Sequence, residues 1–171
     1  SLSGTGSENF SVDSSGNISL VNALDYETAT SYTLALNASD GVNTTTSELI
    51  ITVDDVNEAP SLTNALAASS FAENVSTGTT IATASASDPE SQAITYSLSG
   101  TGSGNFAVDS SGNITLAAGL DYETATSYSL TLSASDGVNT TTNTLAISIS
   151  DVNEAPSLTN ALAASSFAEN V

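Results

Sequence analysis

An internal repeat dominates this chain: the segment from Ser1 to Val75 recurs from Ser97 to Val171, an offset of 96 residues. Position by position, 60 of the 75 aligned residues are identical. A fixed period of this length indicates an array of similar units, each of which packs mainly against its neighbours. Function is therefore expected where units meet as well as within them.

The offset divides the chain into three expected units. Residues 1–60 are predicted to be a unit without its first two strands, residues 61–156 a complete unit, and residues 157–171 the start of a third. Unless those strands come from elsewhere, the unit 1–60 is expected to expose a sheet edge and a partly open core. We interpret the sequence as a window on a longer array or an extracellular fibre.

Short alternating segments rich in Val, Ile, Thr, Tyr and Leu, separated by Gly, Asn, Asp and Ser clusters, predict an all-β fold without helices. In the complete unit the expected strands are 68–72, 79–86, 93–98, 105–108, 113–116, 127–134 and 142–150. Residues 109–113 (Asp-Ser-Ser-Gly-Asn) predict a hairpin loop between two of them. Seven strands in a unit of 96 residues are typical of an immunoglobulin-like, Greek-key β-sandwich.

The alternation is clearest in segment 127–134, where apolar and polar residues occupy opposite faces. The apolar face carries Tyr128, Leu130, Leu132 and Ala134, and the polar face carries Ser127, Ser129, Thr131 and Ser133. One core is expected to use Phe71, Ile81, Ile94, Tyr96, Phe106, Leu120 and Tyr122. A composition rich in Ser, Thr and Asn also fits disorder, but the alternation and these placed hydrophobic residues favour a folded sandwich.

The charge of the chain restricts its partners. Its 171 residues include 19 Asp and Glu but no Lys, Arg or His, for a net charge of −19. Nucleic acids and anionic lipid surfaces are excluded, because binding them depends on cationic side chains. The absence of His and Cys removes the usual zinc ligands and nucleophile–base pairs. No apolar run approaches the ~20 residues that span a bilayer, so direct membrane insertion is not expected. Cations are the natural partners.

Fourteen of the 19 acids are concentrated in short motifs at expected strand ends or loops. The motifs are Leu-Asp-Tyr-Glu at 24–27 and 120–123, Ala-Ser-Asp-Gly at 38–41 and 134–137, Asp-Val-Asn-Glu-Ala-Pro at 55–60 and 151–156, Ala-Glu-Asn at 72–74 and 168–170, and Asp-Pro-Glu at 88–90. Taken alone, an Asp-Gly pair is more typical of a turn than of a metal site. The ordered set indicates an anionic site.

These motifs, in this order, resemble the calcium motifs of cadherin repeats, and the match looks closest to the cadherin-like repeats of large bacterial surface proteins. In that family calcium ions lie between successive domains, held by the lower end of one domain, the linker and the upper end of the next. The resemblance therefore implies Ca²⁺ at each joint and a secreted or cell-surface location.

Carried over to this sequence, the resemblance assigns each candidate ligand to a joint. The first joint would use Asp25, Glu27, Asp55, Asn57, Glu58, Asp88, Glu90 and Asp136. The second joint would use Glu73, Asp121, Glu123, Asp151, Asn153 and Glu154 together with a following unit. By the same logic Asp40 would face a joint that precedes Ser1.

The chemistry of the residues also favours calcium. Calcium accepts six to eight oxygen ligands in flexible geometry, whereas magnesium requires a stricter octahedron and retains its waters. Carboxylates crowded at one joint repel each other unless cations offset them, and either two or three divalent ions would suffice. We expect a joint that is flexible without calcium and rod-like with it.

The predicted function is a calcium-rigidified extender repeat of a bacterial adhesin or extracellular fibre, with neighbouring repeats and identical chains as partners. The alternative is a module that binds carbohydrate or another cell. Paired carboxylates such as Asp121 and Glu123 could also serve glycoside hydrolysis. The chain has no Trp, Arg or His to hold a sugar, so no enzymatic activity is expected.

Overall fold

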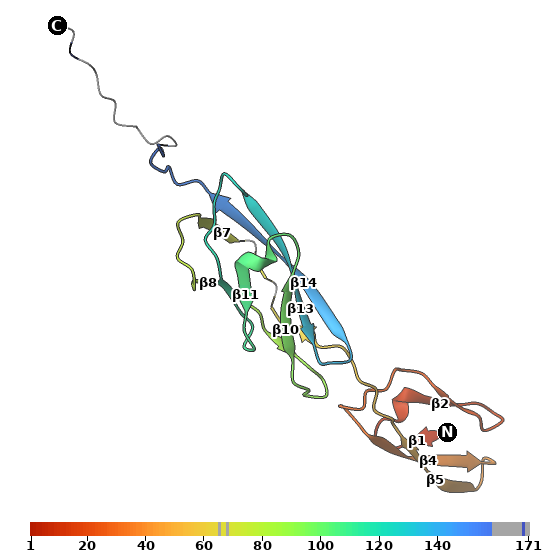
Figure 1. The fold of residues 1–171 in the computed structure, drawn as a ribbon. Coiled ribbons are helices and arrows are strands. Elements are labelled where there is room, and N and C mark those ends of the chain that lie inside the picture. Colours follow the sequence, from red (N-terminus) through yellow and green to blue (C-terminus); the bar gives the residue numbers. More distant parts are fainter. Residues whose placement is uncertain (65, 68, 159–168, 170–171) are drawn as a thin grey trace.

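The structure, a computed structural model, describes residues 1–64, 66–67, 69–158 and 169. We refer to residues 1–60 as the first unit and to residues 61–156 as the second unit. Figure 1 shows them as two bodies arranged end to end along the chain. Of the predicted third unit, only Ser157, Leu158 and Glu169 are among the described residues.

The second unit is a β-sandwich. One sheet has the strand order β10 (Thr95–Ser99), β13 (Ser127–Ser135), β14 (Thr140–Ser150) and β7 (Ser69–Ala72). The other has the order β11 (Phe106–Val108), β12 (Asn113–Leu116) and β8 (Thr80–Thr83). All neighbours pair antiparallel except β7, which lies parallel to β14. The chain crosses between the two sheets from β7 to β8, from β10 to β11 and from β12 to β13, as in the predicted Greek-key sandwich (Figure 1).

The core of the second unit lies between the two sheets. Leu130, Leu132 and Ala134 on β13 are fully buried, so the predicted inward face is confirmed. Leu130 and Leu132 pack with Ile81, Phe106, Ile114, Leu116, Leu145, Ile147 and Ile149. Each such side chain contributes about 1.5–3 kcal/mol by leaving water. The core therefore holds the strand ends, and the loops that extend from them, in fixed positions.

The predicted core residues are largely confirmed. Ile81 and Phe106 are buried, and Phe71, Tyr96, Leu120 and Tyr122 are half-buried against the core. Phe106 also meets the ring of Tyr128 edge to face, with 5.3 Å between the ring centroids. Ile94 is half-buried but does not belong to this cluster.

The predicted strand 79–86 was wrong in the middle, because the backbone leaves β8 at Ala84. The N–H of Ala84 donates to the carbonyl of Gly112 (2.8 Å), and the N–H of Ser85 donates to the side chain of Asn64 (2.7 Å). The chain then pairs as a separate short strand, β9 (Ala86–Ser87), with β6 (Ser61–Leu62). Partners distant in sequence therefore divide one alternating segment between two sheets.

Other boundaries differ by one or two residues, and one class of element was missed. Segment 93–98 forms a strand only from Thr95, and 142–150 begins two residues earlier, at Thr140. Two three-residue 3-10 helices, η1 (Ser7–Asn9) and η2 (Ser103–Asn105), precede a strand in each unit. Both follow a glycine in the left-handed conformation, and a Cβ on Gly102 would lie 2.5 Å from the ring of Tyr128.

The predicted hairpin loop at 109–113 is confirmed. Asp109 shapes it by accepting hydrogen bonds from the N–H groups of Ser111 and Asn113, both at 2.9 Å. Hydrogen bonds from Asn113, first from its side chain, lower the pKa of Asp109. Gly112 has φ of 81°, and a Cβ there would lie 2.3 Å from the carbonyl oxygen of Ala84. The carboxylate of Asp109 therefore stabilises its own loop.

The first unit repeats the same register with fewer strands. Its sheet has the order β1 (Leu2–Ser3), β4 (Ser31–Ser39) and β5 (Thr44–Thr52), and a hairpin joins β2 (Phe10–Val12) to β3 (Ile18–Leu20). Leu34 pairs with Leu49 as Leu130 pairs with Leu145. Its core is partly open: Leu20 is 56% exposed, whereas its counterpart Leu116 is 1% exposed.

Candidate metal centres

The Leu-Asp-Tyr-Glu motif folds into the same tight turn in both units. In the second unit, the N–H and the hydroxyl of Thr124 each donate to the carboxylate of Asp121 at 3.0 Å. In the first unit Thr28 donates to Asp25 in the same way, and its hydroxyl and then its N–H lower the pKa of Asp25. The aspartates therefore close the turns that carry the following glutamates.

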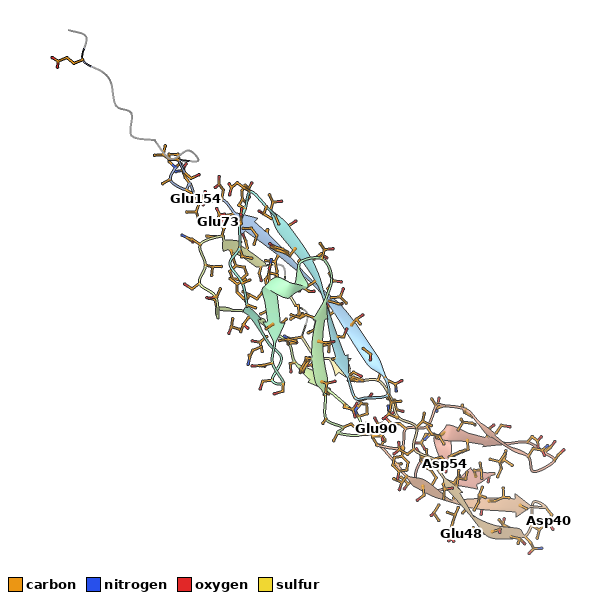
Figure 2. The ribbon with its side chains drawn as sticks, in the orientation of Figure 1. Asp40, Glu48, Asp54, Glu73, Glu90 and Glu154 are labelled. Carbon is orange, nitrogen blue, oxygen red and sulfur yellow. The ribbon has the colours of Figure 1, made fainter. Side chains whose placement is uncertain are left out.

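Three glutamates meet at the end of the second unit near β7 and β14. We call Glu73, Glu123 and Glu154 the end cluster, because one oxygen of each lies within 4.8 Å of the others. Glu73 follows β7, Glu123 belongs to the turn before β13, and Glu154 follows β14. Figure 2 shows Glu73 and Glu154 at this end of the second unit. The three glutamates line one cavity, and Asp121 lines it as well.

Glu73 fastens the end cluster to the fold. This buried carboxylate accepts hydrogen bonds from the backbone N–H groups of Tyr122 and Val152, both at 2.7 Å. These two donors lower the pKa of Glu73. Burial, followed by repulsion from Glu73 and Glu123, raises the pKa of Glu154. Within the end cluster, Glu73 therefore favours its ionised form and Glu154 favours its protonated form.

A second group of carboxylates lies where the two units meet. We call Glu27, Asp55 and Glu90 the joint cluster, because one oxygen of each lies within 4.8 Å of the others. Glu27 belongs to the turn before β4, Asp55 to the linker after β5, and Glu90 to the loop between β9 and β10. Figure 2 shows Glu90 at the end of the second unit that faces the first. Three separate segments therefore converge here.

The joint contains buried oxygens without donors. Both carboxylate oxygens of Glu90, and Oδ2 of Asp88, are buried and have no hydrogen-bond partner in the described part of the chain. Oδ1 of Asp88 instead accepts the N–H of Gln92 at 3.0 Å, which shapes the loop. Buried unpaired carboxylate oxygens are costly. Among the described residues, these are buried oxygens for which a bound cation would supply the missing partner.

Crowding at the joint changes proton affinities. A hydrogen bond that Glu58 and Glu90 can form only when one of them carries a proton, together with burial and repulsion from Glu90 and Glu27, raises the pKa of Glu58 from 4.5 to about 7. The backbone N–H of Glu27 favours its own charged form, but burial and repulsion from Glu90 and Asp55 outweigh it and raise the pKa of Glu27. Glu27 and Glu58 also line one cavity together with Asp25.

Asp136 lies at the joint but is satisfied by N–H donors. Its Oδ1 accepts the backbone N–H groups of Val138 and Asn139, both at 2.6 Å, and its Oδ2 accepts the side-chain amide of Asn57 at 2.8 Å. The amide of Asn57, followed by these backbone donors, lowers the pKa of Asp136. Asp136 therefore faces the linker amide and lies outside the joint cluster.

Two residues that contact the linker were not predicted from the sequence. The side-chain amide of Asn139 donates to the carbonyl of Asn57 at 2.9 Å, and the side-chain amide of Gln92 donates to Oδ1 of Asn57. Asn139 lies in the Asp-Gly turn, and its type indicates only a turn residue. Gln92 belongs to no acidic motif. A search for carboxylates could not find either.

Three further predicted residues lie neither in a cluster nor in the contacts and cavities described above. Asp151 and Asn153 are exposed, and the amide of Asn153 donates to the neighbouring carbonyl of Glu154 at 3.3 Å. Asp40 lies at the opposite end of the first unit from Glu90 (Figure 2). Its carboxylate accepts the N–H groups of Asn43 (2.7 Å) and Val42 (2.9 Å), which lower its pKa.

Fold and site together define a β-sandwich module with oxygen-rich acidic clusters at both ends. The family model for the cadherin domain matches residues 68–150. Residues 68–150 of the chain are therefore a cadherin domain.

Relatives and solved structures agree with this family. Mouse Protocadherin Fat 4 is 33% identical over an alignment of 168 residues, in a match that covers 91% of this chain and 3% of that protein. The Fat-like cadherin-related tumor suppressor homolog of Drosophila melanogaster is 36% identical over an alignment of 167 residues, in a match that covers 91% of this chain and 4% of that protein. The structure of human Protocadherin-24 EC1-2 is 26% identical, with a TM-score of 0.65, and the match covers 89% of this chain and 81% of that one.

The chain spans only 3–4% of the length of the two relatives named above. Both relatives are animal proteins, so they do not support the bacterial context that the motifs suggested. In the described residues, no helix has the length and apolar character needed to cross a membrane.

Proposed function

We propose that this chain is a calcium-rigidified extender segment of a secreted or cell-surface protein. In this proposal residues 1–60, 61–156 and 157–171 are successive units, and divalent cations join them. The observation that carries it is the set of buried, unpaired oxygens of Asp88 and Glu90 where the linker meets both units. Carboxylates in such surroundings favour a cation as partner.

The donor set fits calcium. At the joint Glu27, Asp55, Glu58, Asp88 and Glu90 would hold the ion or ions, with Asp25 and Asp136 adding charge nearby. At the end cluster Glu73, Asp121, Glu123 and Glu154 would do so, with Asp151 and Asn153 available from the linker. All these donors are oxygens, the ligands that calcium takes in flexible geometry and in larger number than magnesium. Bound calcium would supply positive charge that offsets the carboxylates.

The residues themselves convert binding into stiffness. Thr28 holds the turn that presents Glu27, and the sandwich core fixes the loop that presents Glu90. Asp55 lies between them on the linker. Without a cation, three ionised groups within 4.8 Å of one another repel, so this face of the joint opens. With the charge offset, the same three segments are held together and the two units keep one orientation.

The extender role is supported by the similarity of successive units, since 60 of 75 aligned residues are identical. Uniform neighbours suit a spacer better than a ligand-specific module. Its partners would be neighbouring repeats and, in a fibre, identical chains. Cadherin domains are adhesion modules, and we infer no catalytic role for this one. A bacterial source remains a prediction from the motifs.

Calorimetric titration with calcium tests this proposal. The parent chain should bind calcium, and the double variant Glu27→Gln/Glu90→Gln should lose the binding that belongs to the joint. The matched control is Glu48→Gln, which removes an exposed acid on β5 that belongs to neither cluster. No calcium binding by the parent at millimolar calcium, or equal binding by all three proteins, would contradict the proposal.

A further inference from the structure

The linker between the two units is bonded much more strongly to one of them. Asn57 contacts three residues of the second unit: its side-chain amide donates to Asp136 at 2.8 Å, its carbonyl accepts from Asn139 at 2.9 Å, and its Oδ1 accepts from Gln92. Three of the four groups are neutral amides. These bonds therefore do not require a cation.

The linker continues into the second unit beyond Asn57. Pro60 is fully buried, and the next two residues pair as β6 with β9. On the other side, the N–H of Val53 donates to the carbonyl of Thr30 in the first unit at 3.0 Å. In the described part of the chain, residues 54–56 make no hydrogen bond with the first unit. Beyond Val53, the linker meets the first unit through carboxylates: Asp55 lies near Glu27 in the joint cluster, and Glu58 lines one cavity with Glu27.

We propose that Asn57, Asp136, Asn139 and Gln92, here called the amide latch, hold the linker on the second unit when no cation is bound at the joint. Gln92 and Asn139 act as positioning residues for the linker. The joint therefore hinges at residues 54 and 55, between the first unit and the part of the linker that the latch holds. This inference deepens the proposed calcium-dependent joint by locating the part that moves.

The repeat provides a comparison for the latch. Asn43 is the counterpart of Asn139 in the first unit, but in the described residues its side chain serves only the carboxylate of Asp40 in its own turn. Asn153 is the counterpart of Asn57, and its amide donates to the carbonyl of Glu154. Among the described residues, these residue types form the latch where the first linker meets the second unit.

Distance measurements between paired spin labels test the latch directly. The chain has no Cys, so Val56→Cys on the linker and Thr144→Cys on β14 give specific labels at exposed positions. In chelator, this pair should keep the narrow distance distribution that it shows with calcium. Gln92→Ala and Asn139→Ala should shift and broaden it in chelator. Asn139→Asp, which keeps the size but removes the amide donor, should act like Asn139→Ala.

Asn43→Ala is the matched control and should leave the distribution unchanged. Near-ultraviolet circular dichroism of the tyrosines checks that each variant is folded. Equal broadening in the parent and the variants in chelator would overturn the latch, as would narrow distributions in all of them.

A second label pair separates this inference from the proposed function. Glu48→Cys on β5 and Val56→Cys span the hinge, and their distribution should broaden in chelator and narrow with calcium. If it does not respond, calcium rigidification fails while the result for the latch still stands. If the hinge pair responds and the linker pair broadens with it, the latch fails and the rigidification stands.

Discussion

The first unit and residues 97–156 of the second have nearly the same sequence, yet they bury their residues differently. Leu34 and Leu130 are equally buried, at about 1% exposure or less. Leu20, however, is 56% exposed where Leu116 is 1% exposed. Strand pairing is the same in both units, so local pattern specifies register. Burial instead depends on β7 and β8, which have no counterpart within residues 1–60.

Glycine positions show the same contrast. Gly16 and Gly112 occupy the same loop position with φ of 85° and 81°. A Cβ on Gly112 would meet the carbonyl of Ala84, whereas nothing lies within 4 Å of one on Gly16. Glycine is therefore required at position 16 for the turn of the backbone alone, and at position 112 both for this turn and for the close approach of Ala84.

Truncation of Leu116 should give the largest difference between the copies. Leu116→Ala should destabilise the second unit by about 2–5 kcal/mol, because it leaves a cavity in a closed core. Leu20→Ala, the matched control, should change the first unit by no more than about 0.5 kcal/mol. Hydrogen-exchange mass spectrometry reads the two units separately. Equal losses would show that both cores are equally closed.

Alanine at the two glycines should give a smaller difference. The left-handed conformation costs a non-glycine residue about 1–2 kcal/mol, so Gly16→Ala should lower the free energy of unfolding by that amount. Gly112→Ala should lower it clearly more, because the new Cβ would lie 2.3 Å from the carbonyl oxygen of Ala84 and would have to push it away. Urea denaturation of both variants provides the measurement. If Gly112→Ala is as stable as Gly16→Ala, the backbone after β8 can move away from the new Cβ without loss of stability, and the prediction is wrong.

The pH dependence of calcium binding should distinguish Glu58 from its copy Glu154. The pKa of Glu58 is raised from 4.5 to about 7, so a proton on Glu58 stabilises the ion-free joint. This stabilisation is fully present below pH 4.5 and is lost as the pH rises through about 7. Calcium must displace that proton, so affinity at the joint should fall by up to about tenfold per pH unit below 7. Calorimetry in buffers of different ionisation enthalpy would detect the released proton.

Glu58→Gln should flatten this profile. Glu154→Gln, the copy in the end cluster, should leave the profile of the joint as it is. A parent chain whose joint affinity is constant between neutral pH and about pH 5 would contradict the shared proton between Glu58 and Glu90.

Local patterns predicted much of this fold. The inward face of β13 and the Asp109 loop follow from alternation and turn chemistry, which are properties of neighbouring residues. The break at Ala84 could not be predicted in this way, since it depends on Gly112 and Asn64, both distant in sequence.

The candidate site divides along the same line. The motifs predicted that Glu27, Asp55 and Glu90 converge, which the structure bears out in the joint cluster. They did not predict that Asp136 faces an amide, or that Gln92 reaches the linker. Carboxylates are conspicuous in a sequence, whereas a neutral amide gains its role only from the partner that the fold brings to it.

Small-angle X-ray scattering of the whole chain, with calcium and with chelator, tests the central claim most directly. We expect a fixed, rod-like particle with calcium, and in chelator a broader distribution of distances with a different maximum dimension. The Glu27→Gln/Glu90→Gln variant should no longer respond to calcium in this way. Superimposable scattering curves for the parent chain in the two conditions would contradict the claim that cations set the orientation of successive units.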